Sequence, residues 1–397
     1  MKKILFLIIL IVCPTFIYAL DLESKNYIMY NLDNNDVILE QGGKDKVSIA
    51  SLTKIATAIV TIENADNINE TIVLTDEVFI GLKEANASVA GFRVGQTVTI
   101  KDLLYGLILP SGADAANALL LYFDDKDIDL VYEMNKLAKK LNLEATTFKN
   151  TTGLDEDGHK SSVYDVSKLL MYALKNDEFK EIFTKKKYLT SDKSITFTHT
   201  LETTSKYFNT ENPYIIGSKT GYETSAGLCL ASIATINDID YLLVTVGASR
   251  SDRANHLKDQ NEIYKYVSEN YEYKSLASKD DIVYYLNTLY ATKRQYNVLV
   301  PEDIKIYASD SYKKDDYKYV YDGIKVVNPS MKNTMLGTMK VYYKDYLIDE
   351  FDVTYNGSLD YSLEGLFNKY KDYIIYGGIG FIVSFITIRI LRHKKIA

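Results

Sequence analysis

Three short segments of this 397-residue chain hold hydroxyl and amine side chains at spacings that suit acyl transfer. In the first segment Ser51 and Lys54 lie three residues apart, so on a helix they would share one face. A serine hydroxyl is a weak nucleophile until a base takes its proton, and a lysine serves as that base when burial or a nearby cation keeps it neutral. The spacing alone is a weak signal, because about one or two such pairs are expected by chance in a chain of this length.

The second and third segments follow at 111 and 217–221. Ser111 lies after Pro110 in a turn that would expose its hydroxyl, although a serine there could equally cap a helix. Lys219 and Thr220 lie among small residues, which would let a substrate backbone lie against a strand edge. Lys219 would supply the cation that lowers the pKa of Lys54, unless it is only an exposed hairpin lysine.

Alternating helix and strand patterns surround these segments from residue 21 to about 272. A strand pair is expected over 27–40, and two further strands over 227–248, separated by Asn237 and Asp238. Apolar spacing predicts helices at 51–65, 101–109, 113–123, 127–141, 163–173 and 253–271. The mixture predicts one α/β or α+β domain over 21–272.

The remaining body has a different pattern. Residues 273–357 form short alternating runs that predict a small all-β domain, with no histidine or cysteine to carry chemistry, so a spacer or docking role is expected. Residues 358–372 are a mostly polar juxtamembrane linker.

Both ends of the chain indicate export. Residues 1–19 have the layout of a secretory signal peptide: basic start, short apolar run and small final residue. Lipidation at Cys13 is disfavoured, because Val12 stands where a small residue is expected. Residues 373–391 predict a transmembrane helix, and the basic tail 392–397 predicts a cytoplasmic C-terminus with the body outside.

Charge and metal-ligand content exclude some classes of function. Six of the 46 basic residues lie in the terminal segments, which leaves the body with 40 basic and 53 acidic side chains. This acidic body argues against nucleic-acid binding. The four histidines lack ligand spacing, so no metal and no cofactor is expected. Cys229, in an apolar run, is expected to be a buried structural thiol.

In this order the three segments resemble the motifs of the penicillin-recognising serine acyltransferases. The neighbouring residues 50–54, 102–112, 150–154, 217–221 and 226–227 look like the low-molecular-weight penicillin-binding proteins, the serine D-alanyl-D-alanine carboxypeptidases. The resemblance covers residues 27–272, and the β-rich segment and C-terminal membrane attachment match that family's layout. It implies a penicillin-binding/β-lactamase-like transpeptidase fold and a single-pass protein whose catalytic domain lies on the extracytoplasmic face of the cell membrane.

The resemblance also implies roles for individual residues. Ser51 would attack the carbonyl between the two terminal D-Ala residues of a peptidoglycan stem peptide, with Lys54 as the base. Ser111 would relay a proton to the leaving D-Ala, and β-lactams would trap the acyl-enzyme. The implied substrate-binding residues are Lys219 and Thr220 for the substrate carboxylate, Gly221, and Tyr222, whose N–H would join that of Ser51 in the oxyanion hole.

The sequence departs from the family pattern at two places. The second motif usually ends in Asn, but here the residue is Ala113, so substrate binding and the reaction rate are expected to differ from those of the family. Asn117, one helical turn later, is a candidate substitute. The basic residue that some members have ahead of the third motif is also missing, and residues 210–212 stand there instead.

Two alternative functions remain open. A class A-like β-lactamase shares the motifs and would need a deacylating glutamate, for which Glu156 is the nearest candidate. A catalytically silent wall-binding homologue is the other, with Ala113 as a sign of decay.

Overall fold

The computed structural model describes residues 20–309, 317–343 and 346–394, and the chain divides into two compact units between Glu269 and Asn270. The predicted signal peptide at 1–19 and the last three residues of the predicted cytoplasmic tail lie outside the described residues.

The first unit is built on an antiparallel sheet with the strand order β2-β1-β9-β8-β7. The strand pair expected over 27–40 and the two strands expected over 227–248 are confirmed, with Asn237 and Asp238 in the second turn. The strands are β1 (Asn26–Asn31), β2 (Asp36–Gln41), β7 (Ile215–Glu223), β8 (Gly227–Ile236) and β9 (Ile239–Ala248).

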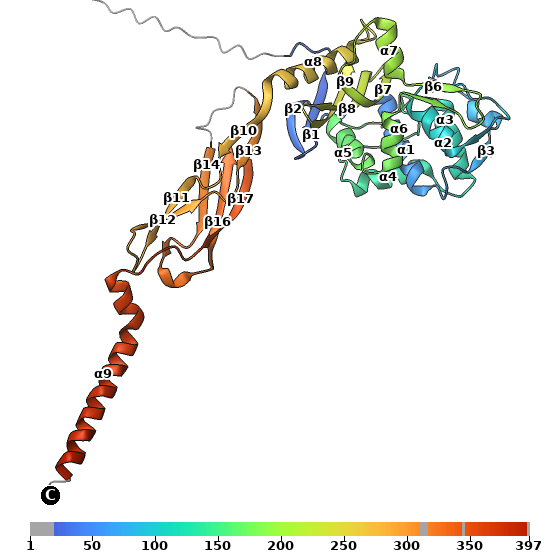
Figure 1. Cartoon of the computed structure of the whole chain (residues 1–397). Helices are drawn as coiled ribbons and strands as arrows, with labels where there is room; N and C mark the ends of the chain where they lie inside the picture. The colour runs from blue at the N-terminus through green and yellow to red at the C-terminus, as the bar shows by residue number, and fades with distance from the viewer. Residues whose placement is uncertain (1–19, 310–316, 344–345, 395–397) are drawn as a thin grey trace, which may run out of the picture. The chain divides into compact units, whose positions relative to one another are not determined.

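Helices cover both faces of this sheet (Figure 1). Residues 229, 231 and 233 of β8 join the large apolar core together with most of the helices, because alternate side chains of a strand point to opposite faces. On the other face, the Ser232 hydroxyl is bonded to Gln260 and Tyr264 of α8. The helices are α1 (Lys54–Asn64), α2 (Ile100–Ile108), α3 (Ala113–Asp124), α4 (Leu130–Lys140), α5 (Val163–Ala173), α6 (Asp177–Thr184), α7 (Thr200–Phe208) and α8 (Asn255–Asn270).

The helix expected over 51–65 has two parts. A 3-10 turn, η1 (Ala50–Thr53), precedes α1, so Ser51 lies in the turn and Lys54 opens the α-helix. Ala50 has a left-handed φ of +48°, a conformation that costs a non-glycine residue about 1–3 kcal/mol unless its surroundings fix it. Small elements complete the unit: β3 (Thr71–Val73), η2 (Asp76–Phe79), β4 (Thr97–Thr99), β5 (Lys187–Leu189) and β6 (Thr196–Thr198).

The second unit begins with short strands, so the predicted all-β pattern is confirmed. They pair as β10-β13, β12-β11-β15 and β14-β16-β17, around two small cores that include Leu286 and Val341. The strands are β10 (Tyr271–Ala277), β11 (Ile282–Thr288), β12 (Gln295–Leu299), β13 (Ile304–Ser309), β14 (Tyr317–Gly323), β15 (Val326–Val327), β16 (Thr334–Tyr343) and β17 (Tyr346–Tyr355), with a 3-10 turn, η4 (Pro329–Met331).

A final helix, α9 (Leu363–Lys394), follows the strands. It starts ten residues before the expected apolar segment because Ser362 caps it, the Ser362 hydroxyl accepting the Gly365 N–H at 3.1 Å. Residues Leu363–Ile388 are long and apolar enough to cross a membrane, and their most apolar stretch packs against nothing in the described chain. The helix could therefore anchor the protein to a membrane.

Candidate active site

Ser51 and Lys54 lie together in the interior of the first unit. The Lys54 Nζ lies 2.8 Å from the Ser51 Oγ and 2.6 Å from the Thr152 carbonyl oxygen, to which it donates. The Lys54 side chain is almost fully buried, whereas Ser51 is partly exposed. The amine is therefore held against a hydroxyl that a substrate can still reach.

Burial sets the protonation state of Lys54. Loss of water contact lowers the Lys54 pKa to about 7, although the carboxylates of Glu223 and Asp114 act in the opposite direction. About half of the amine is thus neutral at pH 7, and a neutral amine has the lone pair that a base needs.

Ser111 and Lys219 form a second hydroxyl–amine pair. Ser111 lies in the turn between α2 and α3 with a left-handed φ of +65°, and Lys219 Nζ donates to its Oγ at 2.8 Å. Ser111 is not a helix cap, because Gly112 occupies that position in α3. Lys219 lies on β7 and is fully buried, so the alternative of an exposed hairpin lysine is wrong.

The charge of Lys54 acts on the second buried amine. Burial first, and then the charge of Lys54, lower the pKa of Lys219 well below its usual value. The expected lowering of the Lys54 pKa is present, but its main cause is burial rather than Lys219.

The rest of the third segment continues along β7, which is an edge of the sheet. The Thr220 hydroxyl is bonded to that of Thr200 at 2.6 Å. A Cβ on Gly221 would lie 3.0 Å from the Ser51 backbone nitrogen, so this strand runs directly past the Ser51 N–H. Tyr222 follows, with the Arg250 guanidinium 4.1 Å from its ring centre.

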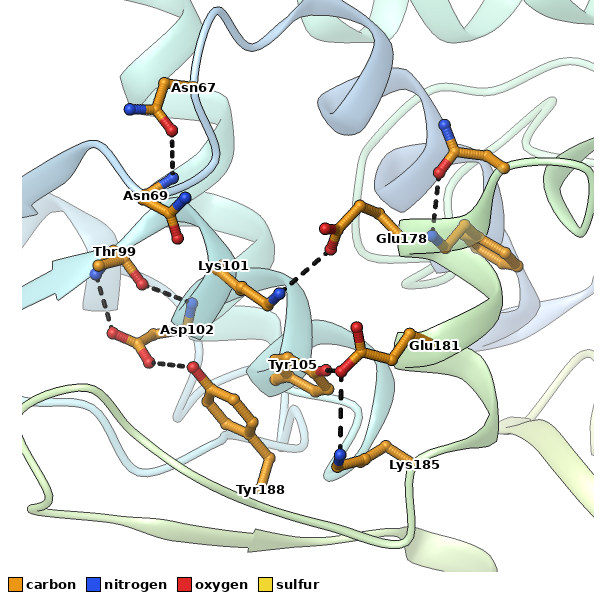
Figure 2. A network of polar contacts seen from close by, with 12 residues as sticks. Asn67, Asn69, Thr99, Lys101, Asp102, Tyr105, Glu178, Glu181, Lys185 and Tyr188 are labelled. Atoms are coloured by element: carbon orange, nitrogen blue, oxygen red, sulfur yellow. Dashed lines mark hydrogen bonds and ion pairs between the residues drawn. The ribbon is translucent and has the colours of Figure 1, made fainter.

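A polar network holds helix α2, which leads into Ser111 (Figure 2). The buried Asp102 carboxylate caps the helix through Thr99 and accepts the Tyr188 hydroxyl at 2.9 Å. Hydrogen bonds that favour its ionised form lower the Asp102 pKa despite burial. On the same helix, Tyr105 donates to Glu181 of α6 at 2.9 Å. These contacts fix the helix to α6 and to the β5–β6 hairpin.

The residues around Ala113 show what replaces the usual Asn. Ala113 is buried, and its N–H donates to the Ser88 carbonyl oxygen at 2.7 Å. Asn117 donates instead to the Val78 carbonyl oxygen at 3.0 Å, so its amide is committed to η2. Asp114, which the sequence did not single out, accepts the N–H groups of Ala90, Gly91 and Phe92 and so fixes the loop beside Ser111.

A loop from α4 to α5 supplies further site residues that the sequence did not assign. The Asn150 side-chain oxygen accepts from the Gly153 N–H at 2.8 Å and from the Thr152 hydroxyl at 3.1 Å, which fixes the carbonyl that binds Lys54. Glu156 is exposed, and its carboxylate accepts from Asn150 at 2.9 Å. His159 bonds to Thr53 between Ser51 and Lys54 at 2.8 Å. The bonds from Thr152 to Lys54 and from His159 to Thr53 join residues 98 and 106 positions apart, so no local pattern could have revealed them.

Within the described ranges, no group of three or more histidine, cysteine or acidic side chains is arranged to hold a metal ion. Cys229 is fully buried, which raises the pKa of its thiol to about 12 and leaves the thiol unreactive.

Comparison with known families and proteins gives matches over both units. Residues 14–250 match the family model D-alanyl-D-alanine carboxypeptidase, and residues 271–360 match the model penicillin-binding protein 5, C-terminal domain. The chain is 28% identical over 327 residues to the D-alanyl-D-alanine carboxypeptidase DacF of Bacillus subtilis, covering 80% of this chain and 81% of that one. It is 32% identical over 247 residues to DacC of Escherichia coli, covering 59% of each.

Solved structures agree on the fold. The Streptomyces K15 DD-transpeptidase superposes with a TM-score of 0.56 at 26% identity, covering 62% of this chain and 97% of that one. Penicillin-binding protein 5 from Haemophilus influenzae superposes with a TM-score of 0.61 at 19% identity, covering 84% and 97%. The first structure therefore matches about three fifths of this chain, and the second matches most of it.

Proposed function

Because the chain belongs to the D-alanyl-D-alanine carboxypeptidase family of serine peptidases, we propose how its own residues remove the terminal D-Ala of a peptidoglycan stem peptide. The family's activity and its penicillin-binding class are shared by the relatives described above. The assignment of steps to Ser51, Lys54, Ser111 and residues 219–222 is our own. It is carried by one observation, the buried Lys54 amine 2.8 Å from the Ser51 hydroxyl.

The substrate lies along β7 as an added strand. An edge strand offers free backbone groups to an extended peptide. The amine of Lys219 and the hydroxyl of Thr220 hold the C-terminal carboxylate, whose charge favours the protonated form of the amine. The absence of a Cβ on Gly221 lets β7 pass close to the Ser51 N–H. Arg250, stacked on Tyr222, adds positive charge near that end of the strand.

Acylation begins at Ser51. Neutral Lys54 takes the Ser51 proton while the Oγ attacks the carbonyl carbon between the two D-Ala residues. The negative charge that forms on the carbonyl oxygen is held by the N–H groups of Ser51 and Tyr222. Ser111 relays the proton that Lys54 took to the amine of the departing D-Ala, and the C–N bond breaks to leave an ester on Ser51.

Deacylation uses the same groups in reverse order. A water molecule attacks the ester carbonyl, and its proton is taken by Lys54, directly or through Ser111. The same proton returns to the Ser51 oxygen, which leaves as the hydroxyl. A β-lactam enters the same sequence, but its leaving group stays attached after the ring opens. A long-lived acyl-enzyme on Ser51 is the expected result.

Membrane attachment would determine on which side of the membrane this reaction takes place. We propose that residues 373–391 of α9 span the cell membrane once and that both units before it lie on the extracytoplasmic face, after removal of residues 1–19. The apolar helix and the basic residues at its end support this orientation. The domain boundaries near 272 and 357 are part of the same proposal.

Labelling with a fluorescent penicillin tests the assignment. The purified protein should form a covalent adduct that peptide mapping places on Ser51, and Ser51→Ala should take no label. Absence of label on the folded wild-type protein would refute the proposed site. Rapid, repeated hydrolysis of the β-lactam would instead favour a β-lactamase.

A further inference from the structure

The peptide unit between Ala50 and Ser51 is held from both sides. Because a trans peptide is planar, its C=O and N–H point in opposite directions, so whatever fixes the Ala50 oxygen also aims the Ser51 N–H. A Cβ on Gly153 would lie 2.0 Å from the Ala50 oxygen, and one on Gly221 would lie 3.0 Å from the Ser51 nitrogen. The two glycines therefore leave this peptide little room to turn.

One hydrogen bond fixes the carbonyl end of this peptide. The Thr53 Oγ1 lies 2.9 Å from the Ala50 oxygen, to which only the hydroxyl can donate. A hydroxyl has a single hydrogen, so Thr53 must act as acceptor toward its other partner, the His159 Nε2 at 2.8 Å.

The other ring nitrogen of His159 fixes the protonation state of the ring. The Lys149 N–H donates to the His159 Nδ1 at 3.0 Å, so Nδ1 carries no proton and Nε2 does. The ring is only 4% exposed, and its chain of bonds runs in one direction, from His159 through Thr53 to the Ala50 oxygen.

We propose that His159 is a positioning residue for acylation, which acts through Thr53 to hold the Ala50–Ser51 peptide so that the Ser51 N–H points at the developing oxyanion. The inference rests on the proposed function, in which that N–H is one of the two oxyanion donors. Ala50 needs such support because its left-handed φ of +48° is unfavourable for a residue with a Cβ. The ring itself does not touch the reacting atoms.

Protonation of His159 would break the bond from Lys149 that holds the ring, although the donor to Thr53 would remain. An imidazolium has no acceptor at Nδ1, so the Lys149 N–H would face another N–H. The charged groups around the ring are Glu156, Asp155 and Lys160: the two carboxylates raise the His159 pKa and Lys160 lowers it. Burial is the largest effect and lowers the His159 pKa, which favours the neutral ring.

Two substitutions at His159 separate its two hydrogen bonds. In His159→Asn the amide oxygen replaces Nδ1 and keeps the Lys149 bond, but the donor to Thr53 is lost. In His159→Gln the longer amide places an N–H near the Nε2 position and restores that donor. The measurement is stopped-flow acylation of the full-length protein in detergent by a fluorescent penicillin, which separates binding from the covalent step.

The expected result is a difference between the two variants. His159→Asn should acylate about 10- to 100-fold more slowly with an unchanged dissociation constant for the complex before acylation, because an oxyanion donor acts mainly in the transition state. His159→Gln should recover most of that loss. Equal rates in wild type and His159→Asn, or an equal loss in both variants, would overturn the proposal.

A second substitution keeps the test decisive if His159→Asn does not fold. Thr53→Val removes the hydrogen bonds from His159 to Thr53 and from Thr53 to the Ala50 oxygen, but it leaves the bond between Lys149 and His159. It should therefore show the same slow acylation with an unchanged dissociation constant for penicillin. A wild-type rate in folded Thr53→Val would overturn the proposal. If the folded wild-type protein takes no label at all, the proposed function fails, and the role of His159 fails with it. If wild type is labelled but the variants react as fast as wild type, only the role of His159 fails.

The pH profile gives a readout that simple loss of packing would not change. Once the pH is low enough to protonate His159, the wild-type acylation rate should fall more steeply than one proton per molecule allows, because both Lys54 and His159 then take up protons. In His159→Gln only the Lys54 proton should remain in the profile. An identical steepness in both proteins would contradict the role of the ring.

Discussion

At the scale of single residues, the site depends on a lysine that burial keeps partly neutral. Lys54 has a pKa of about 7 because its ammonium form has lost contact with water. The neutral amine is the reactive form, so acylation of Ser51 should rise about tenfold per pH unit just below pH 7, more steeply at the lower pH where His159 also titrates, and level off above pH 7. Penicillin acylation rates between pH 5 and 9 would check this, and a flat profile would contradict it.

Glu223 offers a way to shift that profile. Its carboxylate is the largest influence that raises the Lys54 pKa, so Glu223→Gln should lower this pKa further and move the midpoint of the acylation profile to lower pH. The measured quantity is the pH at half-maximal acylation rate, with binding of penicillin as the control. A midpoint that stays fixed or moves upward would show that Glu223 does not influence the base.

At the scale of elements, Gly153 lets the loop from α4 to α5 approach the backbone at Ser51. Gly153 and Gly158 share a φ of +79°, but a Cβ on Gly153 would collide with Ala50, whereas one on Gly158 would meet only the end of the Lys149 side chain at 3.3 Å. Both alanine substitutions should cost about 1–3 kcal/mol of stability through backbone strain. Gly153→Ala should lose a further ~1–3 kcal/mol and most of its acylation rate.

Thermal or urea unfolding of the two glycine variants, with penicillin labelling of each, makes the comparison. Gly158→Ala is the matched control, since it carries the same strain without the collision. Equal losses in the two variants would mean that the close approach to Ala50 does not matter.

The network in Figure 2 is expected to stabilise the fold without taking part in catalysis. Asp102→Ala removes the acceptor of partly buried hydrogen bonds from Thr99, Tyr188 and Ser191, which should cost about 1–3 kcal/mol of unfolding free energy. Because the folded state lowers the Asp102 pKa, this stabilisation is present above pH 4 and is lost as pH falls below it. Unfolding curves at pH 7 and pH 3 should show a smaller difference between variant and wild type at pH 3.

The folded Asp102→Ala variant should still label at Ser51 within about twofold of wild type, because Asp102 lies outside the proposed machinery. A large loss of labelling in the folded protein would assign this network a part in catalysis.

The sequence predicts the elements that carry strong local patterns. Helix α5 and strands β8 and β9 lie where apolar spacing placed them, and residues 51, 54, 111 and 219 meet as the order of the motifs implied. Helices α6 and α7 are short and partly polar, and no pattern predicted them. His159 and Thr152 reach the site across 106 and 98 residues, so only the folded chain reveals them.

At the scale of the whole molecule, an acidic body precedes an apolar helix. The body carries 40 basic and 53 acidic side chains, and the amines of Lys54 and Lys219 are buried inside it. This distribution suits an enzyme that uses amines only where a substrate carboxylate and a hydroxyl proton are handled. The apolar helix then explains how such a protein would stay near its wall substrate without diffusing away.

Removing the helix tests that arrangement. A chain that ends at Ser362 keeps the hydrogen bond from the Ser362 N–H to Tyr290 but lacks Leu363 to Ala397. It should move from the membrane fraction to the soluble fraction and keep its acylation rate. Retention of the shortened chain in washed membranes would show that another part of the protein provides the attachment.

The most direct test of the central claim is mass spectrometry of a pentapeptide ending in D-Ala-D-Ala after incubation with the full-length protein in detergent. The account predicts a tetrapeptide and free D-alanine, formed by wild type and not by Ser51→Ala. An unchanged pentapeptide with folded wild type, or equal cleavage by Ser51→Ala, would contradict the assignment of Ser51 as the nucleophile of a D-alanyl-D-alanine carboxypeptidase.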